Sequence, residues 1–247
     1  MTRRSSSVVA AMLVLAGLCA GVGAGRARAS TTSLSRPVSG SPVAWTPNVL
    51  DGRVDAIAEV GRRVVVGGTF TAVQAASGGP VLRRAHVFSF DPATGAVDPG
   101  FAPVLDGPVT SLAAAPGGSA VFVGGSFAHV GAAAVRGLAE LALAGGAPVP
   151  GFSAPTDGPV LDLVLRGGLL YAGGACTRVG GVPRGRLAAV DPSTGAVSPR
   201  LDVAFTVPFA DNMPEQVTQF DVSADGRRLV AIGNFERAGG APAPRWP

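Results

Sequence analysis

The side chains that could do chemistry are few, and they form no recognisable catalytic pattern. The 247 residues include two histidines, two cysteines and one tyrosine. His86 and His129 have no partners at metal-ligand spacing, so both are interpreted as structural residues. Tyr171 is the only tyrosine, which excludes an oxidase centre that needs two, and no G-x-S-x-G elbow or G-K-[ST] phosphate loop occurs. The sequence therefore predicts no catalytic residue, no metal site and no cofactor.

The elements that would position any site come from an internal repeat of about fifty residues. A short apolar segment recurs as V-G-G-T-F at residues 66–70, V-G-G-S-F at 123–127, A-G-G-A-C at 172–176 and A-I-G-N-F at 231–235. An Asp-Gly turn followed within two residues by valine precedes the first three copies and begins at Asp51, Asp106 and Asp157. Because the Gly-Gly segment and the Asp-Gly turn recur at the same spacing, the sequence indicates a repeat protein.

Each repeat unit is predicted to form four short strands. In the first unit these lie at about residues 54–59, 63–69, 85–91 and 96–101. Apolar and polar residues alternate at 86–90, which is typical of a half-buried strand. Asp-Gly and D-P-x-T-G segments supply the turns, because Asp caps its own turn and Gly accepts a positive φ. The pattern predicts an all-β fold, a β-propeller built of four-stranded antiparallel blades, over a β-solenoid or a β-sandwich.

The repeat resembles the delta-60-repeat β-propellers, a kelch-like family of secreted bacterial proteins. The resemblance runs from about residue 45 to residue 247, and its carriers are the V-G-G-x-F strand, the D-P-x-T-G-A-V turn at 91–97 and the closing P-G-F. The Tyr and Trp that usually follow Gly-Gly in kelch blades are absent. The resemblance implies a propeller fold, extracellular placement and attachment to larger surface proteins, and it implies no defined activity.

The repeat also sets the expected domain organisation. A flexible lead-in at residues 30–44 precedes the propeller region at 45–247. The units are expected at about 51–105, 106–156, 157–214 and 215–247, the last of them incomplete. Residues 45–50 look like the closing strand of a preceding unit, so the chain is predicted to be a partial copy with about three and a half blades. The alternative is four blades that close with one strand short.

The first 29 residues are predicted to be a secretory signal peptide. Arg3 and Arg4 give a basic start, residues 8–20 are almost wholly apolar, and A-R-A at 27–29 offers a cleavage site. An uncleaved membrane anchor is the alternative. Cleavage after Ala29 predicts a secreted protein without a membrane span.

Loss of the signal segment changes the charge and the cysteine content. The segment contains four arginines and no acidic residue. Its removal therefore lowers the 20 basic residues to 16, which equals the 16 acidic residues. A net charge of zero gives no support for a nucleic-acid partner. Cys19 leaves as well, so Cys176 remains alone and no internal disulfide is expected.

The repeat separates structural residues from functional ones, because a functional residue is expected to be unique to one unit. Asp51, Asp106 and Asp157 recur at one position and are interpreted as turn residues. The aspartates of the D-P-x-T-G turns follow the same reasoning. Cys176 stands where the other units have phenylalanine, which predicts a buried thiol and not a nucleophile.

One stretch, residues 202–216, is longer than its counterparts and breaks the period. Loops that vary between units commonly carry binding groups, because the strands hold them in place. Asp211, Asn212 and Glu215 are therefore the only ligand-binding candidates. The competing interpretation is a solvated insertion without a role in binding.

These observations predict a non-enzymatic extracellular module that binds a protein or carbohydrate at the cell surface or acts as a spacer. The first alternative is a secreted hydrolase or lyase whose active site lies on the rim loops. The second is a truncated fragment without an independent function.

Overall fold

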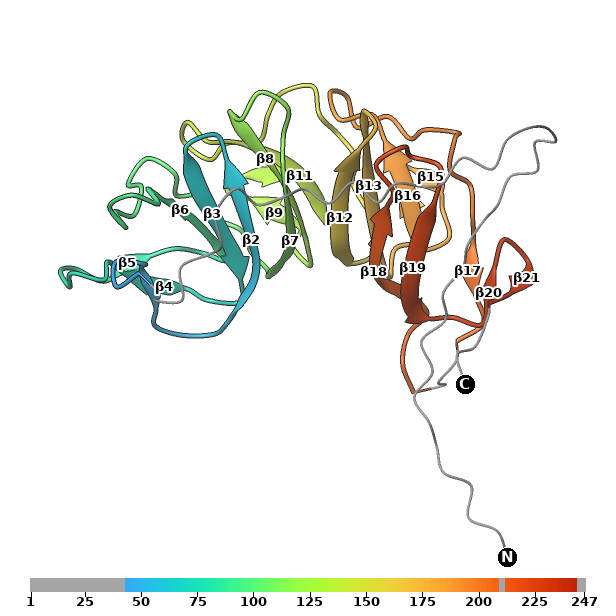
Figure 1. The fold of residues 1–247 in the computed structure, drawn as a ribbon, viewed down its shortest axis with the longest axis horizontal. Coiled ribbons are helices and arrows are strands. Elements are labelled where there is room, and N and C mark those ends of the chain that lie inside the picture. The colour runs from blue at the N-terminus through green and yellow to red at the C-terminus, as the bar shows by residue number, and fades with distance from the viewer. Residues whose placement is uncertain (1–42, 209–211, 244–247) are drawn as a thin grey trace, which may run out of the picture.

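The computed structural model describes residues 43–208 and 212–243, and every regular element within them is a β-strand. All paired strands are antiparallel. The sheets follow one another along an open arc, with the first unit at one end and the last at the other (Figure 1). The predicted all-β class is confirmed, and the arc does not close on itself.

Each unit contributes one main sheet, and the residue ranges 51–105, 106–156, 157–214 and 215–243 are called units 1 to 4. Unit 1 contains β2 (Val54–Val60), β3 (Arg63–Gly68) and β6 (Val87–Phe90). Unit 2 contains β7 (Val109–Ala114), β8 (Ala120–Gly125) and β11 (Leu138–Ala142). Unit 3 contains β12 (Val160–Arg166), β13 (Leu169–Gly174) and β16 (Leu187–Val190). Unit 4 contains β18 (Gln216–Val222) and β19 (Leu229–Asn234).

A short side hairpin follows the second main strand of every unit. The four hairpins are β4 (Ala72–Gln74) with β5 (Leu82–Arg83), β9 (His129–Val130) with β10 (Ala133–Ala134), β14 (Arg178–Val179) with β15 (Val182–Pro183), and β20 (Arg237–Ala238) with β21 (Ala241–Pro242). The segment that enters each unit pairs with its hairpin, as β1 (Asn48–Val49) does with β4 and β17 (Phe205–Thr206) with β20. The sequence reasoning missed these hairpins.

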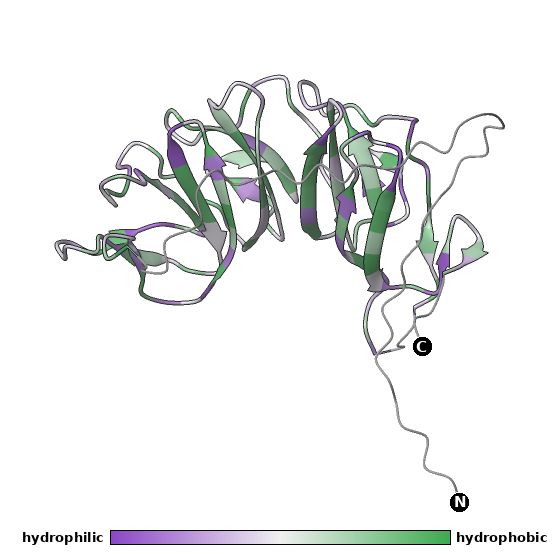
Figure 2. Cartoon of the chain, in the orientation of Figure 1, coloured by the Kyte–Doolittle hydropathy of each residue, from purple (hydrophilic) through white to green (hydrophobic). Residues whose placement is uncertain are grey.

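The hydrophobic core lies between successive main sheets. Val65 of unit 1 packs in one buried cluster with Val109 and Val121 of unit 2. Phe122 of unit 2 shares the next cluster with Val160 of unit 3. The same pattern joins unit 3 to unit 4, and Figure 2 shows the hydrophobic residues concentrated on the main strands. Burial between units therefore stabilises the arc, as in repeat proteins whose units contact only their neighbours.

The recurring glycine pair is explained by two close approaches. A Cβ on Gly67 would lie 2.4 Å from Val109 Cγ1 of the next unit. A Cβ on Gly68 would lie 2.0 Å from the carbonyl oxygen of Arg53 in the neighbouring strand. The first glycine makes room for a side chain of the next unit, and the second makes room for the backbone beside a β-bulge between Val54 and Ala56.

The predicted fourth strand of each blade is wrong, because the main sheets of units 1 to 3 have three strands. Residues 96–101 of unit 1 contribute a single bridge, Phe90 to Val97, and units 2 and 3 each have one equivalent bridge. Pro99 follows two residues after the bridge and has no N–H to continue the ladder. The predicted third strand at 85–91 begins only at Val87, because His86 adopts a left-handed φ of 69°.

Several sequence predictions lie outside the described residues. They include the signal segment 1–29, most of the lead-in at 30–44, and Asp211. Across the described part of the chain, no helix is long and apolar enough to cross a membrane. The unit boundaries and secretion stay predictions.

Candidate functional site

The recurring aspartates each hold the start of their unit to its side hairpin. Asp51 Oδ1 accepts hydrogen bonds from the N–H groups of Thr71 (2.8 Å) and Ala72 (2.9 Å), and its Oδ2 accepts one from the Thr71 hydroxyl (2.5 Å). Asp157 makes the same three bonds with Thr177 and Arg178. A carboxylate bound in this way acts as a structural brace.

Units 2 and 4 replace parts of this brace with other groups. Ala128 of unit 2 has no hydroxyl, and His129 Nδ1 lies 2.7 Å from Asp106 Oδ2 instead. At the entry to unit 4, the aspartate position is taken by Pro214, the last residue of unit 3. There the side-chain amide of Asn234 donates to the carbonyl oxygens of Met213 (2.8 Å) and Pro214 (3.1 Å), which lie just before β18.

Hydrogen bonding keeps these carboxyl groups ionised. The pKa of Asp51 is lowered mainly by the Thr71 hydroxyl, and the pKa of Asp106 is lowered mainly by the backbone N–H of His129. Burial raises the pKa of Asp157, but the hydrogen bonds from Thr177 and Arg178 outweigh it and the net direction is down. Carboxyl groups with lowered pKa values are poor proton donors near neutral pH. Their role in the structure is to stabilise the turn.

The three candidates from the loop at 202–216 fall in different places. Asp211 lies outside the described residues, and Asn212 is exposed. Glu215 is partly buried, and its Oε2 accepts a hydrogen bond from Arg186 Nη2 of unit 3 (2.8 Å). Its Oε1 accepts one from the N–H of Val207 (2.9 Å), a β-branched residue held at a φ of 63°. Both carboxylate oxygens of Glu215 thus have partners within the protein.

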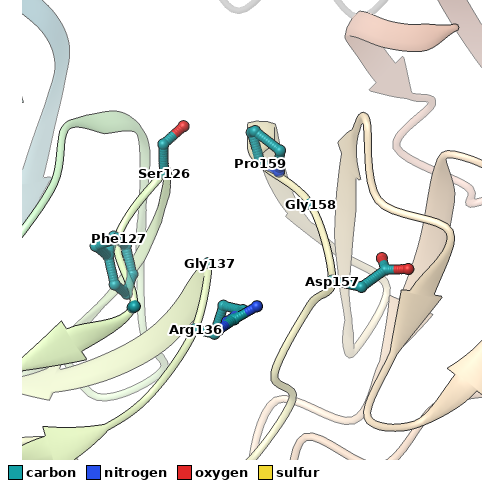
Figure 3. A pocket seen from close by; sticks show the side chains of 9 residues that line it. Ser126, Phe127, Arg136, Gly137, Asp157, Gly158 and Pro159 are labelled. Atoms are coloured by element: carbon teal, nitrogen blue, oxygen red, sulfur yellow. The ribbon is translucent and has the colours of Figure 1, made fainter. Parts of the chain in front are cut away.

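A cavity of about 230 Å³ lies between units 2 and 3 (Figure 3). Phe127 and Arg136 line it from unit 2, and the turn 157–159 lines it from unit 3. The Arg136 side chain points into the space between the units, while the Asp157 carboxylate points away from it (Figure 3). Within the described residues the Arg136 guanidinium has no hydrogen-bond or ion-pair partner. The cavity therefore presents one free positive charge.

At this interface alone, two corresponding positions on neighbouring units are both glycine. A left-handed residue opens the third main strand of units 1 to 3, with φ values of 69° at His86, 71° at Gly137 and 75° at Arg186. Arg186 faces Glu215 across the interface of units 3 and 4, and the ion pair fills that space. Gly137 faces Gly158, and a Cβ on Gly137 would lie 1.9 Å from Thr156 Oγ1. The two positions that hold the Arg186–Glu215 salt bridge at the next interface are thus glycines here.

Arg136 is a candidate binding residue that the sequence reasoning missed. Units 1 and 3 have Ala85 and Gly185 at the position of Arg136, just before the left-handed residue. Arg136 is therefore unique to one unit, which is the signal that could have identified it.

The remaining reactive groups offer no catalytic centre in residues 43–208 and 212–243. Cys176 is buried in the core at the phenylalanine position, as expected, and burial raises the pKa of its thiol to about 11. Among these residues no three His, Cys, Asp or Glu side chains are grouped to hold a metal ion. His86 has a buried Nδ1 without a described partner.

Comparisons with known proteins give only distant likenesses. No protein-family model and no curated protein matches the sequence. Two computationally designed proteins are similar in structure. For Ika8 the identity is 18%, the TM-score is 0.37, and the match covers 74% of this chain and 46% of that one, so this chain spans less than half of its length. Ika4 is 17% identical with a TM-score of 0.38, and the match covers 72% of this chain and 90% of that one. BamB from Moraxella catarrhalis is 12% identical with a TM-score of 0.19, over 78% and 99% of the two chains.

Proposed function

We propose that the chain is a segment of an extracellular β-propeller of the delta-60-repeat kind, and that it acts as a non-enzymatic binding or spacing module. The units are its blades. The observation that carries the proposal is the contrast between two sets of charged groups. The aspartates that recur are bound within their own units, whereas the guanidinium of Arg136, unique to unit 2, faces an open cavity.

The cavity favours a partner with an anionic group. The equivalent space between units 3 and 4 contains a carboxylate, Glu215, bound to Arg186. Arg136 offers a free guanidinium beside glycine backbone at the corresponding place, and a guanidinium binds carboxylates through paired N–H donors. An acidic side chain of a cell-surface protein, or the carboxylate of an acidic polysaccharide, fits this chemistry.

A binding experiment with a matched control tests the proposal. The full-length chain is measured against immobilised polygalacturonate, which is acidic, and dextran, which is neutral. Arg136→Gln is expected to weaken binding to polygalacturonate by about tenfold, the loss of one charge-assisted contact. Arg166→Gln removes an exposed arginine away from the cavity and should leave binding unchanged. Equal loss in both variants would mean that charge alone, and not the cavity, attracts the polymer.

A second measurement tests the absence of enzyme activity. The chain and its Asp211→Ala, Asn212→Ala double variant are compared in a screen of polysaccharide and peptide hydrolysis. The proposal expects no turnover by either protein. Turnover that the double variant loses would establish a secreted enzyme with its site on the 202–216 loop. A soluble monomer with one cooperative melt would in turn exclude a fragment without independent folding.

Export has its own test, independent of binding. The chain is expressed with its first 29 residues in a bacterium, and the N-terminus of the recovered protein is sequenced. A start at Ser30 in the external fraction is expected. An intact N-terminus in the membrane fraction would show a retained anchor.

A further inference from the structure

The same packing joins each pair of neighbouring units. Two apolar side chains on the first main strand of one unit lie over the first glycine of the unit before it. We call the two side chains the knob pair and the glycine the seat. The knob pairs and seats are Val109 and Leu112 on Gly67, Val160 and Leu163 on Gly124, and Val217 and Phe220 on Gly173.

The seats fit closely and need glycine. A Cβ on the seat would lie 2.4 Å from the knob at Gly67 and 2.8 Å at Gly124 and Gly173. Separations below about 3 Å between carbon atoms are strongly repulsive, because optimal contact is at roughly 3.5–4.0 Å. Even alanine at a seat would therefore displace the unit above it.

The two ends of the arc break this pattern in opposite ways. At the first end, Val54 and Ile57 form a knob pair for which residues 43–208 and 212–243 supply no seat, and they are 41% and 67% exposed. The counterparts of Val54, which are Val109, Val160 and Val217, are fully buried. At the other end, the seat position of unit 4 holds Ile232.

The register confirms that Ile232 stands at a seat. Ile232 pairs with Gln219 across β18 and β19, as Gly173 pairs with Asp162 across β12 and β13. Its side chain is 37% exposed. A branched side chain of four carbons thus occupies the space into which the next knob pair would pack.

A hydrogen bond accompanies the seat at two of the three interfaces. Ser111 Oγ of unit 2 accepts the N–H of Leu163, and Asp162 Oδ2 of unit 3 accepts the N–H of Phe220, both at 2.9 Å. In each bond, the N–H belongs to the second knob residue of one unit. The acceptor belongs to the preceding unit and lies two residues after that unit's knob valine, as Ser111 follows Val109 and Asp162 follows Val160. Ile57 is the equivalent donor residue at the free end. A partner with a seat glycine and an oxygen-bearing side chain at that position would complete both contacts.

We propose that Val54 and Ile57 form a docking surface for a repeat unit of the same kind supplied by another chain, one with glycine at the seat. Continuity with the three internal interfaces identifies the occupant. Ile232 excludes a second copy of this chain, because its own last unit has no open seat. The free knob pair therefore selects a partner with Gly-Gly in its second strand and prevents head-to-tail growth of identical chains.

The test opens the seat in the chain itself. Ile232→Gly gives each full-length molecule a seat for the Val54 and Ile57 of another copy, with Gln219 as the hydrogen-bond acceptor. Sedimentation should show the unaltered chain as a monomer and the variant as species of at least twice its mass. Ile232→Ala should stay monomeric, because its Cβ still fills the seat. Val54→Asp with Ile57→Asp, added to Ile232→Gly, should restore the monomer.

A matched variant controls for the effect of glycine in a strand. Val230→Gly removes a β-branched residue from the same strand and the same face without opening the seat, and it should remain monomeric. If Ile232→Gly does not fold, Val54→Gly provides the reverse fit, with Ile232 entering a new seat in another copy, and should also assemble. A folded Ile232→Gly monomer overturns the proposal. So does assembly of the unaltered chain that Val54→Asp and Ile57→Asp abolish, because the seat would then be unnecessary.

Discussion

Asp106 Oδ2 and His129 Nδ1 lie 2.7 Å apart, within hydrogen-bond distance, at the place where a threonine hydroxyl binds the aspartate in units 1 and 3. The hydroxyl position has become Ala128, and the next residue has taken over its role. The substitution shows how one unit can lose a side-chain contact of the repeat and regain it from a neighbouring residue. It also gives His129 a structural contact within its own unit.

This relationship predicts a rescue. His129→Ala removes the contact to Oδ2 but leaves the two backbone N–H bonds to Oδ1, so the melting temperature should fall by a few degrees at most. Ala128→Thr added to His129→Ala should recover the loss, because it recreates the arrangement of unit 1. Ala128→Thr alone should gain little, since Oδ2 already has a partner. Failure of the rescue in a calorimetric scan would show that His129 contributes by packing.

Acid should weaken the protein through the three aspartates. Their pKa values are lower in the folded chain than the ordinary value of about 3.9, so the folded state binds fewer protons than the unfolded state at low pH. The stability that they provide is complete above about pH 4 and is lost as the pH falls through their folded-state values.

Urea titrations from pH 7 to pH 2 measure this effect. A variant with Asn at positions 51, 106 and 157 should have a lower midpoint than the unaltered chain at pH 7 and should lose less on acidification. Asp202→Asn changes an aspartate that is 74% exposed and serves as the control. It should follow the pH dependence of the unaltered chain. Parallel curves for all three proteins would refute the role assigned to the aspartates.

Much of the main-sheet framework could be predicted from the sequence, because the repeat shows each element several times. The strands expected at 54–59 and 63–69 match β2 and β3 to within a residue. The structural role of the aspartates followed from their recurrence. Recurrence reports what each unit needs for its own folding, and local hydrogen bonds and strand pairing belong to that class.

Features that depend on contact between units could not be predicted in this way. The cavity beside Arg136 is lined by residues 136–137 of unit 2 and by residues 157–159 of unit 3, and these segments meet only when the sheets pack. The side hairpins were missed for another reason. Their strands are two or three residues long and lie in segments rich in turn residues, such as 75–81, so no alternating pattern marks them.

Breaking the ion pair between units 3 and 4 should destabilise the chain. Arg186 and Glu215 are 17% and 25% exposed, so Glu215→Gln leaves a partly desolvated guanidinium without its counter-charge. A loss of about 1–3 kcal/mol in the free energy of unfolding is expected. Arg53→Gln breaks the pair with Asp55, in which Arg53 is 72% exposed, and should cost about 0–1 kcal/mol. Similar losses from both variants in urea unfolding would contradict the structural role of Glu215.

Asp162 should behave in the opposite way to the recurring aspartates. Its carboxylate is partly buried between units 3 and 4 and accepts hydrogen bonds from the N–H groups of Phe220 and Leu163. Burial raises its pKa, and the bond from Phe220 only partly offsets this. A raised folded-state pKa means that the group stabilises the fold only at low pH, and that this contribution is lost as the pH rises through the folded value. The ionised form is therefore unfavourable at neutral pH.

Two substitutions separate the charge of Asp162 from its hydrogen bonds. Asp162→Asn keeps an oxygen acceptor and removes the charge, so at pH 7 the free energy of unfolding should be unchanged or higher. Asp162→Leu leaves the N–H of Phe220 without its acceptor, while the N–H of Leu163 keeps Ser111 Oγ, and the free energy of unfolding should fall by about 1–3 kcal/mol. Urea unfolding at pH 7 measures both. A destabilised Asp162→Asn would show that the negative charge itself is favourable at this interface, because the amide preserves the acceptor and changes little else.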